Sequence, residues 1–323
     1  MILIFGSYDD PHIEIVKHYL NEYEIKTVHI GESDNAIITA SVSNKKDKIY
    51  ALVNDQIYDM SCIKTVWWRA KPLIRFYKNN LFKESVINFQ YDEWLAFAKG
   101  LYGYVPEYLW INNIKNIYIS NIKMLQLRVA KKIGFNIPET RITNNANEVN
   151  ELINEYKEII YKPLHKRFFT SEKGLEKILY TALIDKETLP NLIDSIKMCP
   201  GIYQENIVKK YELRITVIEN DFFAIKIESQ KNPITKIDWR KSHNTNIYNI
   251  VDIPHNIKEM ILKYMNYFGL KYGAFDFIFN KDNEYVFLEC NPTGQWLWLE
   301  KMTQVKISQA LAEKLLRMHE NAN

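Results

Sequence analysis

The sequence predicts a mixed α/β (α+β) fold, and two patterns support this class. In the first third of the chain, short apolar runs alternate with helical patterns, a rhythm typical of βαβ units. Beyond residue 200, apolar strands are separated by short polar turns, as in antiparallel hairpins. With 47% hydrophobic residues among 323, the chain is long and apolar enough for two or three domains.

The first domain is expected over residues 1–118. A helix begins near Pro11, and a second, amphipathic helix covers about 89–101. The strands of this domain are expected at 2–5, 27–30, 49–53 and 65–68.

A central domain is expected over residues 119–200. It opens with a helix that Ser120 caps and Gly134 ends. Strands follow at 159–161 and 177–181, and another helix lies near 189–197. The buried stripe of the first helix is expected to comprise Met124, Leu127, Ala130 and Ile133.

The last domain, residues 201–323, is expected to contain two antiparallel hairpins and a C-terminal helix. Asn220 and Asp221 form the turn of the first hairpin, and residues 280–283 form that of the second. The paired strands are 213–218 with 222–227 and 274–279 with 285–290, and the helix covers about 302–318.

Charge, cysteine content and hydropathy exclude several classes of function. The net charge of +3 provides no strong field that would favour nucleic acid or an anionic membrane as the partner. Cys62, Cys199 and Cys290 are widely spaced, which suits reduced thiols better than disulfides or a zinc site. Because we find no signal peptide and no membrane-spanning window, we expect a cytoplasmic protein. A homodimer stays open.

Two carboxylates in the second hairpin are the strongest chemical signal. If Phe279 pairs with Glu284, then Asp276 faces Phe287. Glu289 then lies diagonally across from Asp276 on the same face. Carboxylates on one face repel each other unless a cation or a basic side chain compensates them.

Asn291 follows Glu289 with a period of two and adds an amide to the same face, whose neighbours Ala274, Ile278 and Phe287 are apolar. Mg²⁺ prefers one or two carboxylates completed by water and phosphate oxygens, and this cluster offers them. The alternative is that nearby Lys or Arg side chains satisfy both carboxylates.

The turn after this strand and two lysines could serve a phosphate site. Asn291-Pro292-Thr293-Gly294 turns sharply, and the absence of a side chain at Gly294 permits close approach of the backbone. Lys162 follows an apolar strand and could balance phosphate charge, although a solvated strand end is the alternative. Lys123 is equally ambiguous.

These residues, in this order and spacing, resemble the ATP-grasp superfamily. The resemblance rests on Asp276, Glu289-Cys290-Asn291-Pro292, Lys162-Pro163 and the 203–207 segment. More narrowly, the chain looks like the peptide macrocyclases of the microviridin type, the graspetide synthetases. The segments that carry the narrower resemblance are Asp9-Asp10-Pro11-His12, Val66-Trp67-Trp68-Arg69, Trp110-Ile111-Asn112, Lys123 with Gln126-Leu127, Gly134 to Pro138 with Thr140, Tyr180-Thr181, Glu212-Leu213-Arg214, Ile237-Asp238-Trp239-Arg240 and Gly294-Gln295-Trp296.

The resemblance implies an ATP-grasp fold with an N-terminal Rossmann-like pre-ATP-grasp domain, with ATP and Mg²⁺ as cofactors. It assigns phosphate contacts to Lys123 and Lys162, and a ribose contact to Glu212. Its magnesium ligands are Asp276, Glu289 and Asn291. Its adenine hinge is the backbone from Glu205 through Asn206 to Ile207, and Gln204 is a further cofactor-binding residue.

Two arginines remain for the substrate. Because guanidinium groups bind carboxylates through two parallel hydrogen bonds, Arg214 and Arg240 are expected to hold the acceptor carboxylate. The alternative for each is a structural ion pair. Asp238 is a candidate base, or it orients Arg240.

The loop after Lys162-Pro163, which we call the phosphate lid, departs from the glycine-rich pattern of many ATP-grasp enzymes. In it, His165, Lys166 and Arg167 precede a single glycine at position 174. The lid could cover the triphosphate by charge, or be a plain exposed loop.

The implied reaction is ATP-dependent phosphorylation of a Glu or Asp side chain in a ribosomally made precursor peptide, dependent on its leader. Attack by a Ser or Thr hydroxyl gives an ester, and attack by a Lys amine gives an amide. The main alternative is an ATP-grasp ligase that adds free amino acids, such as glutamate, to a protein or small-molecule carboxylate. A non-catalytic nucleotide-binding protein is a third possibility, which the acidic set argues against.

Overall fold

The computed structural model describes most of the chain. The described residues are 1–31, 36–44, 48–53, 55–69, 105–165, 168–170, 176–242 and 247–322, together with single residues between 86 and 100. Within the helix expected at 89–101, the residues that the structure describes are helical, and the others lie outside the described residues. Among the described residues, no helix has the length and hydropathy to span a membrane.

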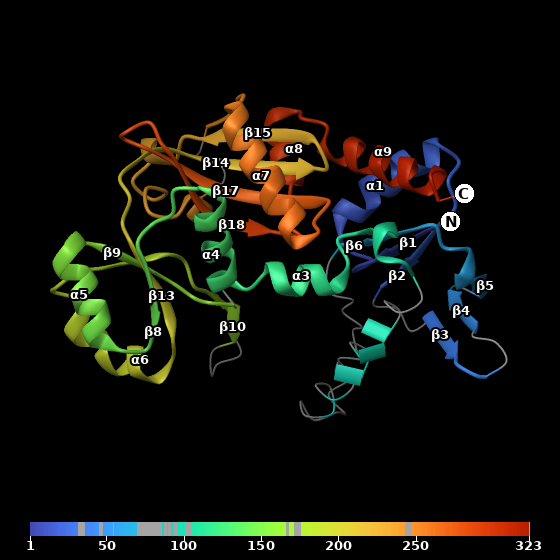
Figure 1. Ribbon diagram of the computed structural model, residues 1–323, viewed down its shortest axis with the longest axis horizontal. Coiled ribbons are helices and arrows are strands. Elements are labelled where there is room, and N and C mark those ends of the chain that lie inside the picture. Colours follow the sequence, from blue (N-terminus) through green and yellow to red (C-terminus); the bar gives the residue numbers. More distant parts are fainter. Residues whose placement is uncertain are drawn as a thin grey trace.

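The N-terminal part is built on a four-stranded parallel sheet with the strand order β2-β1-β6-β7 (Figure 1). This confirms the predicted βαβ pattern, because helix α1 (Pro11–Glu22) connects β1 to β2. The expected strand at 49–53 belongs instead to a separate antiparallel sheet, β3-β4-β5. The strands are β1 (Ile2–Phe5), β2 (Thr27–Ile30), β3 (Ala36–Ser41), β4 (Lys48–Val53), β5 (Gln56–Asp59), β6 (Thr65–Trp68) and β7 (Trp110–Ile111).

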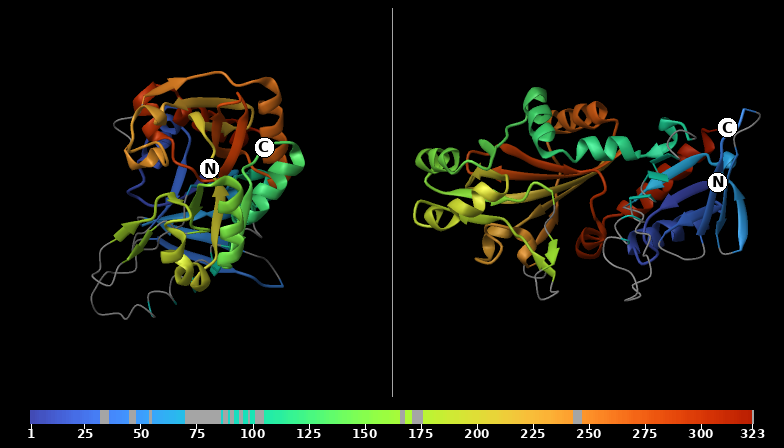
Figure 2. Two further views of the ribbon diagram at one scale, coloured as in Figure 1. Left: turned by 90° about the vertical axis from the view of Figure 1, so that its left-hand side faces the viewer. Right: turned by 90° about the horizontal axis from the view of Figure 1, so that it is seen from below.

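One face of the parallel sheet is covered from both ends of the chain. Helix α9 (Ile307–Glu320) packs against α1 and β6, and the two helices lie side by side in Figures 1 and 2. Their contact belongs to an apolar cluster that joins Ile4 and Ile13 to Leu311 and Leu315. The last helix therefore completes the core of the first domain.

Two helices connect the N-terminal part to the rest. These are α3 (Ile114–Ser120) and α4 (Lys123–Ile133), so the expected boundary at residue 118 falls within α3. The prediction that Ser120 caps a helix is wrong. Ser120 is the last residue of α3, where its hydroxyl donates to the Ile117 carbonyl. The predicted helix is α4, which begins after Ile122 without a side-chain cap. Gly134 ends α4 with a φ of 110°, as expected.

The central part is a small antiparallel sheet with the order β12-β9-β13-β8. Apolar faces of α5 (Ala146–Tyr156) and α6 (Ile193–Met198) pack on it. The strands are β8 (Thr140–Thr143), β9 (Ile159–Lys162), β12 (Ala182–Ile184) and β13 (Gly201–Glu205), with the hairpin β10 (Phe168–Thr170) and β11 (Glu176–Ile178) beside them. Because β13 pairs with both β8 and β9, the sheet crosses the expected domain boundary at residue 200.

The large antiparallel sheet has the order β16-β15-β14-β17-β18, and it confirms both predicted hairpins. Helices α4 and α7 (His255–Phe268) cover one of its faces (Figures 1 and 2). Its strands are β14 (Lys209–Ile218), β15 (Asp221–Ile227), β16 (Tyr248–Ile250), β17 (Tyr272–Asn280) and β18 (Tyr285–Asn291). Short 3₁₀ helices lie at Met60–Cys62, Glu107–Leu109, Leu189–Leu192, Ser229–Lys231 and Trp239–Lys241.

The predicted register of the second hairpin is wrong by one residue near its turn. Phe279 pairs with Tyr285, and Phe277 pairs with Phe287. The ladder then shifts at Leu288, so Asp276 pairs directly with Glu289. This β-bulge is invisible to a period-two pattern, and it places Phe287 in the core face rather than beside Asp276.

The expected C-terminal helix at 302–318 is divided in the structure. Helix α8 (Leu297–Thr303) ends at Gln304, whose φ is 61°, and α9 begins at Ile307. A left-handed residue stops a helix because the following N–H can no longer continue the ladder. The break lets Ser308 donate to Glu300 and places α9 against α1.

Candidate active site

Glu212 and Arg214 lie on the face of the large sheet that is opposite to α4 and α7. Along β14, Leu213, Ile215 and Val217 point into the core beneath these helices. Because side chains alternate along a strand, Glu212 and Arg214 lie on the opposite face. Both are nearly inaccessible, at 6% exposure each. Charged side chains buried this far must be paired.

Two ion pairs neutralise the carboxylates of the β17–β18 hairpin. Arg214 Nη1 donates to Asp276 Oδ1 at 2.9 Å. Lys123 Nζ donates to Glu289 Oε2 at 2.7 Å. Asn291 Nδ2 donates to Glu289 Oε1 at 3.2 Å. The basic partners that the sequence left open as an alternative are thus present.

This donor set fits Mg²⁺. Asp276, Glu289 and Asn291 all offer hard oxygen ligands, and the pairing of their strands brings the three together. Within the described part of the chain, no group of three His, Cys, Asp or Glu side chains could hold a metal. Two carboxylates and one amide are therefore an incomplete cage, of the kind that Mg²⁺ completes with water and phosphate oxygens.

Lys162 approaches this face from the small sheet. Its Nζ donates to Gln204 Oε1 at 2.9 Å, and Gln204 Nε2 in turn donates to Thr140 Oγ1. Burial lowers the pKa of Lys162 to about 8, while Glu289 acts in the opposite direction and Arg240 adds to the lowering. Lys162 therefore interacts electrostatically with Glu289 and Arg240, and its hydrogen bond to Gln204 holds it in place instead of leaving it solvated at a strand end.

The segment expected to contact the base and ribose lies where β13 passes into β14. Glu205 ends β13, and its N–H donates to the Glu139 carbonyl. Asn206 and Ile207 follow in the connection to β14. Glu212 accepts from Lys209 Nζ at 2.7 Å and from the Ser229 hydroxyl at 2.8 Å, both through Oε1.

Asp238 and Arg240 form a bidentate pair. Arg240 Nε donates to Asp238 Oδ1 at 2.7 Å, and Nη2 donates to Oδ2 at 2.6 Å. Asp238 also accepts from the Thr181 N–H. Although burial opposes it, the Arg240 guanidinium holds the pKa of Asp238 far below its usual range. Such a carboxylate is a weak base, so the geometry favours the alternative in which Asp238 orients Arg240.

Gln126 is a site residue whose role the sequence did not reveal. Its buried amide donates from Nε2 to the Cys290 carbonyl at 2.8 Å and accepts from the Cys290 N–H at 3.0 Å. Cys290 separates Glu289 from Asn291, so this amide fixes the backbone between two candidate ligands. A buried glutamine at helical spacing among apolar residues was the available signal.

The backbone at Gly294 approaches its neighbours so closely that there is no room for a side chain at this position. A Cβ at this position would lie 2.6 Å from Arg214 Nη2 and 2.5 Å from Ala274 Cβ. The turn therefore packs directly on the candidate acceptor-binding arginine. In the lid, Lys166 and Arg167 lie outside the described residues.

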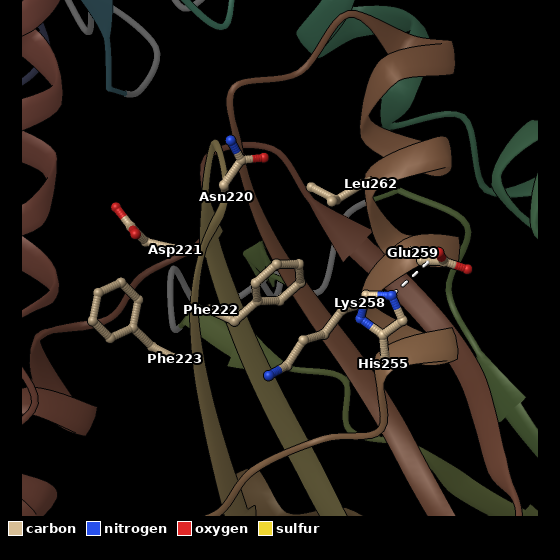
Figure 3. A pocket seen from close by; sticks show the side chains of 8 residues that line it. All are labelled: Asn220, Asp221, Phe222, Phe223, His255, Lys258, Glu259 and Leu262. Carbon is tan, nitrogen blue, oxygen red and sulfur yellow. Dashed lines mark ion pairs between the residues drawn. The ribbon is translucent and has the colours of Figure 1, made fainter.

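A surface pocket of about 440 Å³ is separate from this site (Figure 3). It lies between the β14–β15 turn and α7, on the far face of the sheet, and no predicted site residue lines it. Its lining residues are Asn220, Asp221, Phe222, Phe223, His255, Lys258, Glu259 and Leu262.

Comparison with known proteins identifies the family. Residues 120–315 match the RimK-like ATP-grasp domain. The chain belongs to the RimK-like ATP-grasp family. This assignment covers the small sheet, the large sheet and all the candidate metal and nucleotide residues. The protein is therefore an ADP-forming ATP-grasp ligase, a class that uses ATP and Mg²⁺.

Solved ATP-grasp structures resemble the whole chain. A RiPP-associated ATP-grasp ligase of Chryseobacterium gregarium, in complex with ADP and a leader and core peptide, is 26% identical with a TM-score of 0.87, over 98% of this chain and 96% of that one. The macrocyclase MdnC of Microcystis aeruginosa, bound with the precursor peptide MdnA, is 27% identical with a TM-score of 0.85, over 98% and 99%.

The chain is also similar to a ligase of another kind. The tetrahydromethanopterin:alpha-L-glutamate ligase of Methanocaldococcus jannaschii is 24% identical over 258 residues, which cover 76% of this chain and 83% of the relative.

Proposed function

We propose that this ATP-grasp enzyme is a leader-dependent peptide macrocyclase, which activates Glu or Asp side chains of a ribosomally made precursor and joins them to Ser, Thr or Lys side chains. One observation carries the proposal. The chain shares its architecture over nearly its full length with two ligases that bind precursor peptides, including the N-terminal part that lies outside the ATP-grasp domain.

The first step of the proposed reaction is phosphorylation of a carboxylate. Arg214 and Arg240 hold the substrate carboxylate, and one of its oxygens attacks the γ-phosphorus of ATP in line. The bond between the γ-phosphorus and the β-phosphate oxygen breaks, and ADP leaves. Lys123 and Lys162 neutralise the phosphate oxygens as charge moves toward ADP.

Asp276, Glu289 and Asn291 would hold Mg²⁺, which supplies positive charge to the β- and γ-phosphates and orients them. Lys123 and Arg214, which pair with these acids in the structure, would shift toward phosphate and substrate oxygens when the acids bind the metal. In this proposal, the two acids exchange Lys123 and Arg214 for Mg²⁺ as their partner, and the two basic side chains become available to phosphate and substrate.

In the second step, a Ser or Thr hydroxyl or a Lys amine attacks the acyl carbon. The carbon–oxygen bond to phosphate breaks, phosphate leaves, and the nucleophile loses one proton. Because Arg240 already neutralises Asp238, we expect solvent or the departing phosphate to take this proton. The product is lighter than the precursor by one water for each bond formed.

The test uses peptides encoded by short reading frames beside the gene, with repeated Thr/Ser and Glu/Asp near their C-termini. Incubation with enzyme, ATP and Mg²⁺ should release one ADP for each water lost, and should require the leader. Hydroxylamine should trap the activated carboxylate as a hydroxamate. No mass loss across such precursors would overturn the proposal.

A second candidate is a ligase that adds free amino acids, which the similarity to a glutamate ligase favours. In the same assay with free glutamate, this activity would increase the mass of the acceptor. A cytoplasmic location and a homodimer remain predictions.

A further inference from the structure

We propose that Asp10, His12 and Arg69 of the N-terminal domain position Arg214 through the segment of residues 293–297. The inference rests on the proposed function, in which Arg214 binds the acceptor carboxylate. It assigns a task to three sequence motifs that the nucleotide site does not use.

The first contacts join the N-terminal domain to the backbone of this segment. His12 Nε2 accepts from the N–H of Trp296 at 3.2 Å and from that of Leu297 at 3.4 Å. Arg69 Nη1 donates to the Thr293 carbonyl at 2.6 Å. Two side chains, from α1 and from the end of β6, thus hold both ends of the turn that follows Asn291.

Asp10 fixes the orientation of both side chains. Its Oδ1 lies 2.7 Å from His12 Nδ1, and its Oδ2 lies 3.2 Å from Arg69 Nε. Because Nε2 faces two backbone donors, we assign the proton to Nδ1, where it donates to Asp10. Asp10 also caps α1 by accepting from the His12 N–H, so the helix start and the cluster form one unit.

The cluster is buried and packed around Trp296. His12, Arg69 and Trp296 are 5%, 4% and 1% exposed. The His12 ring meets the edge of Trp296 at 4.6 Å between centroids, and the Arg69 guanidinium lies 5.1 Å from the Trp296 ring centre. Burial lowers the pKa of His12, and Asp10, Arg69 and Glu300 are the charged groups that influence it. The neutral ring required by the hydrogen bonds is thereby favoured.

The same segment reaches the active site on its other side. The Gln295 carbonyl accepts from Arg214 Nη2 at 3.3 Å. The Gly294 carbonyl accepts from the Tyr272 hydroxyl at 2.7 Å. Contacts therefore run without a gap from Asp10 to the guanidinium of Arg214. A shift of the segment would move the guanidinium, which Gly294 touches directly.

The alternative is that the cluster only fastens two domains together. If the cluster only fastens the domains, its disruption should lower stability, and activity should fall only as far as the fraction of folded enzyme falls. A positioning role predicts a lower kcat for peptide-dependent ADP release in a folded enzyme, with unchanged affinity for ATP, because Lys123 and Lys162 lie outside the path.

Two substitutions of one residue separate these roles. In His12→Gln, the side-chain oxygen can reach the place of Nε2 and accept from Trp296. In His12→Asn, the amide ends near the place of Nδ1 and cannot. His29→Asn is the matched control, since His29 is also buried and its ring bonds the Gly6 carbonyl within the N-terminal domain.

The experiment combines hydrogen exchange with kinetics. His12→Asn should speed exchange of the Trp296 and Leu297 amides about tenfold or more and reduce kcat by about tenfold or more, with the Kd of a non-hydrolysable ATP analogue within about twofold. His12→Gln should keep most of the protection and of kcat. His29→Asn should leave the protection of residues 292–299 at the wild-type level.

Unchanged exchange in His12→Asn would overturn the inference, as would faster exchange with a wild-type kcat. Equal loss of kcat in His12→Asn and His29→Asn, at equal loss of thermal stability, would also overturn it in favour of fastening. The exchange measurement needs no substrate. A wild-type enzyme that modifies no peptide would therefore overturn the proposed function alone, and unchanged exchange of these amides in His12→Asn would still overturn the inference.

Discussion

Asp276 lies directly opposite Glu289 across the β17–β18 ladder, because the strand bulges at Leu288. In a regular ladder Asp276 would face a neighbour of Glu289, and the two acids would point to different places. The bulge instead brings two carboxylates together, and Arg214 and Lys123 form ion pairs with them. The arrangement is thus prepared for a cation that both acids can share.

If these acids hold Mg²⁺, Glu289→Gln should reduce ADP formation by about 100-fold or more. The melting temperature of Glu289→Gln should be close to that of the wild type, because Lys123, the ion-pair partner of Glu289, is partly exposed. Asp276→Asn should act similarly on ADP formation but cost up to about 3 kcal/mol of stability, since it weakens the partner of buried Arg214. Glu284→Gln, at the turn of the same hairpin, is the control. Near-normal turnover of Glu289→Gln would contradict the metal assignment.

The charge of Lys162 should control ATP affinity through pH. With a pKa of about 8, Lys162 is protonated below this pH and loses its charge as the pH rises through it. Affinity for an ATP analogue, measured by titration calorimetry, should therefore weaken from about pH 7 to about pH 9. In Lys162→Arg the guanidinium stays charged, so the decline should disappear. Lys162→Ala should bind weakly throughout, and parallel profiles of wild type and Lys162→Arg would rule out this role.

The two arginines should affect the acceptor rather than the nucleotide. Arg240→Ala and Arg214→Ala should lower peptide-dependent ADP release by about 100-fold, with nucleotide affinity within about twofold of wild type. Arg240→Lys keeps the charge but not the two parallel hydrogen bonds, so it should recover only part of the activity. Arg141→Ala removes an exposed arginine of the small sheet as a control. A matching loss of ATP affinity would move the arginines to the nucleotide site.

Gln126→Leu should destabilise the enzyme, because it leaves the buried N–H and carbonyl of Cys290 without partners. The expected cost is about 2–3 kcal/mol in the free energy of unfolding, measured by urea denaturation. Gln309→Leu on α9, whose amide bonds Glu313 near the surface, should cost well under about 1 kcal/mol. Equal costs would show that the Cys290 contacts contribute little.

Local patterns predicted much of this fold. The alternation of Leu213, Arg214 and Ile215 indicates which side chains face the core and which face the site, because the period of a strand is fixed. The stop at Gly134 was equally readable, since it depends on the conformational preferences of a few adjacent residues. The first hairpin was also predicted, but its turn is Glu219-Asn220, one residue before the predicted Asn220-Asp221, because Asp221 already pairs with Ile218.

Other features depend on partners that are distant in the sequence. The bulge at Leu288 places Phe287 in the core, and Ser120 fails as a cap because it is still the last residue of α3, while α4 begins only after Ile122. The bond from Arg69 to Thr293 joins residues 224 positions apart. The motifs around these two residues indicated family membership, but only the folded chain brings them into contact.

The packing of α9 on α1 has a consequence for synthesis of the protein. The ribosome makes the parallel strands β1 and β6 before the two antiparallel sheets, yet Leu311 and Leu315, which cover one side of that layer, are made after those sheets. Until then Ile4, Ile13 and Trp67 stay exposed to water or to chaperones. The folding unit at this end of the molecule is therefore discontinuous in sequence, and it closes only after the catalytic sheets between its two halves have been translated.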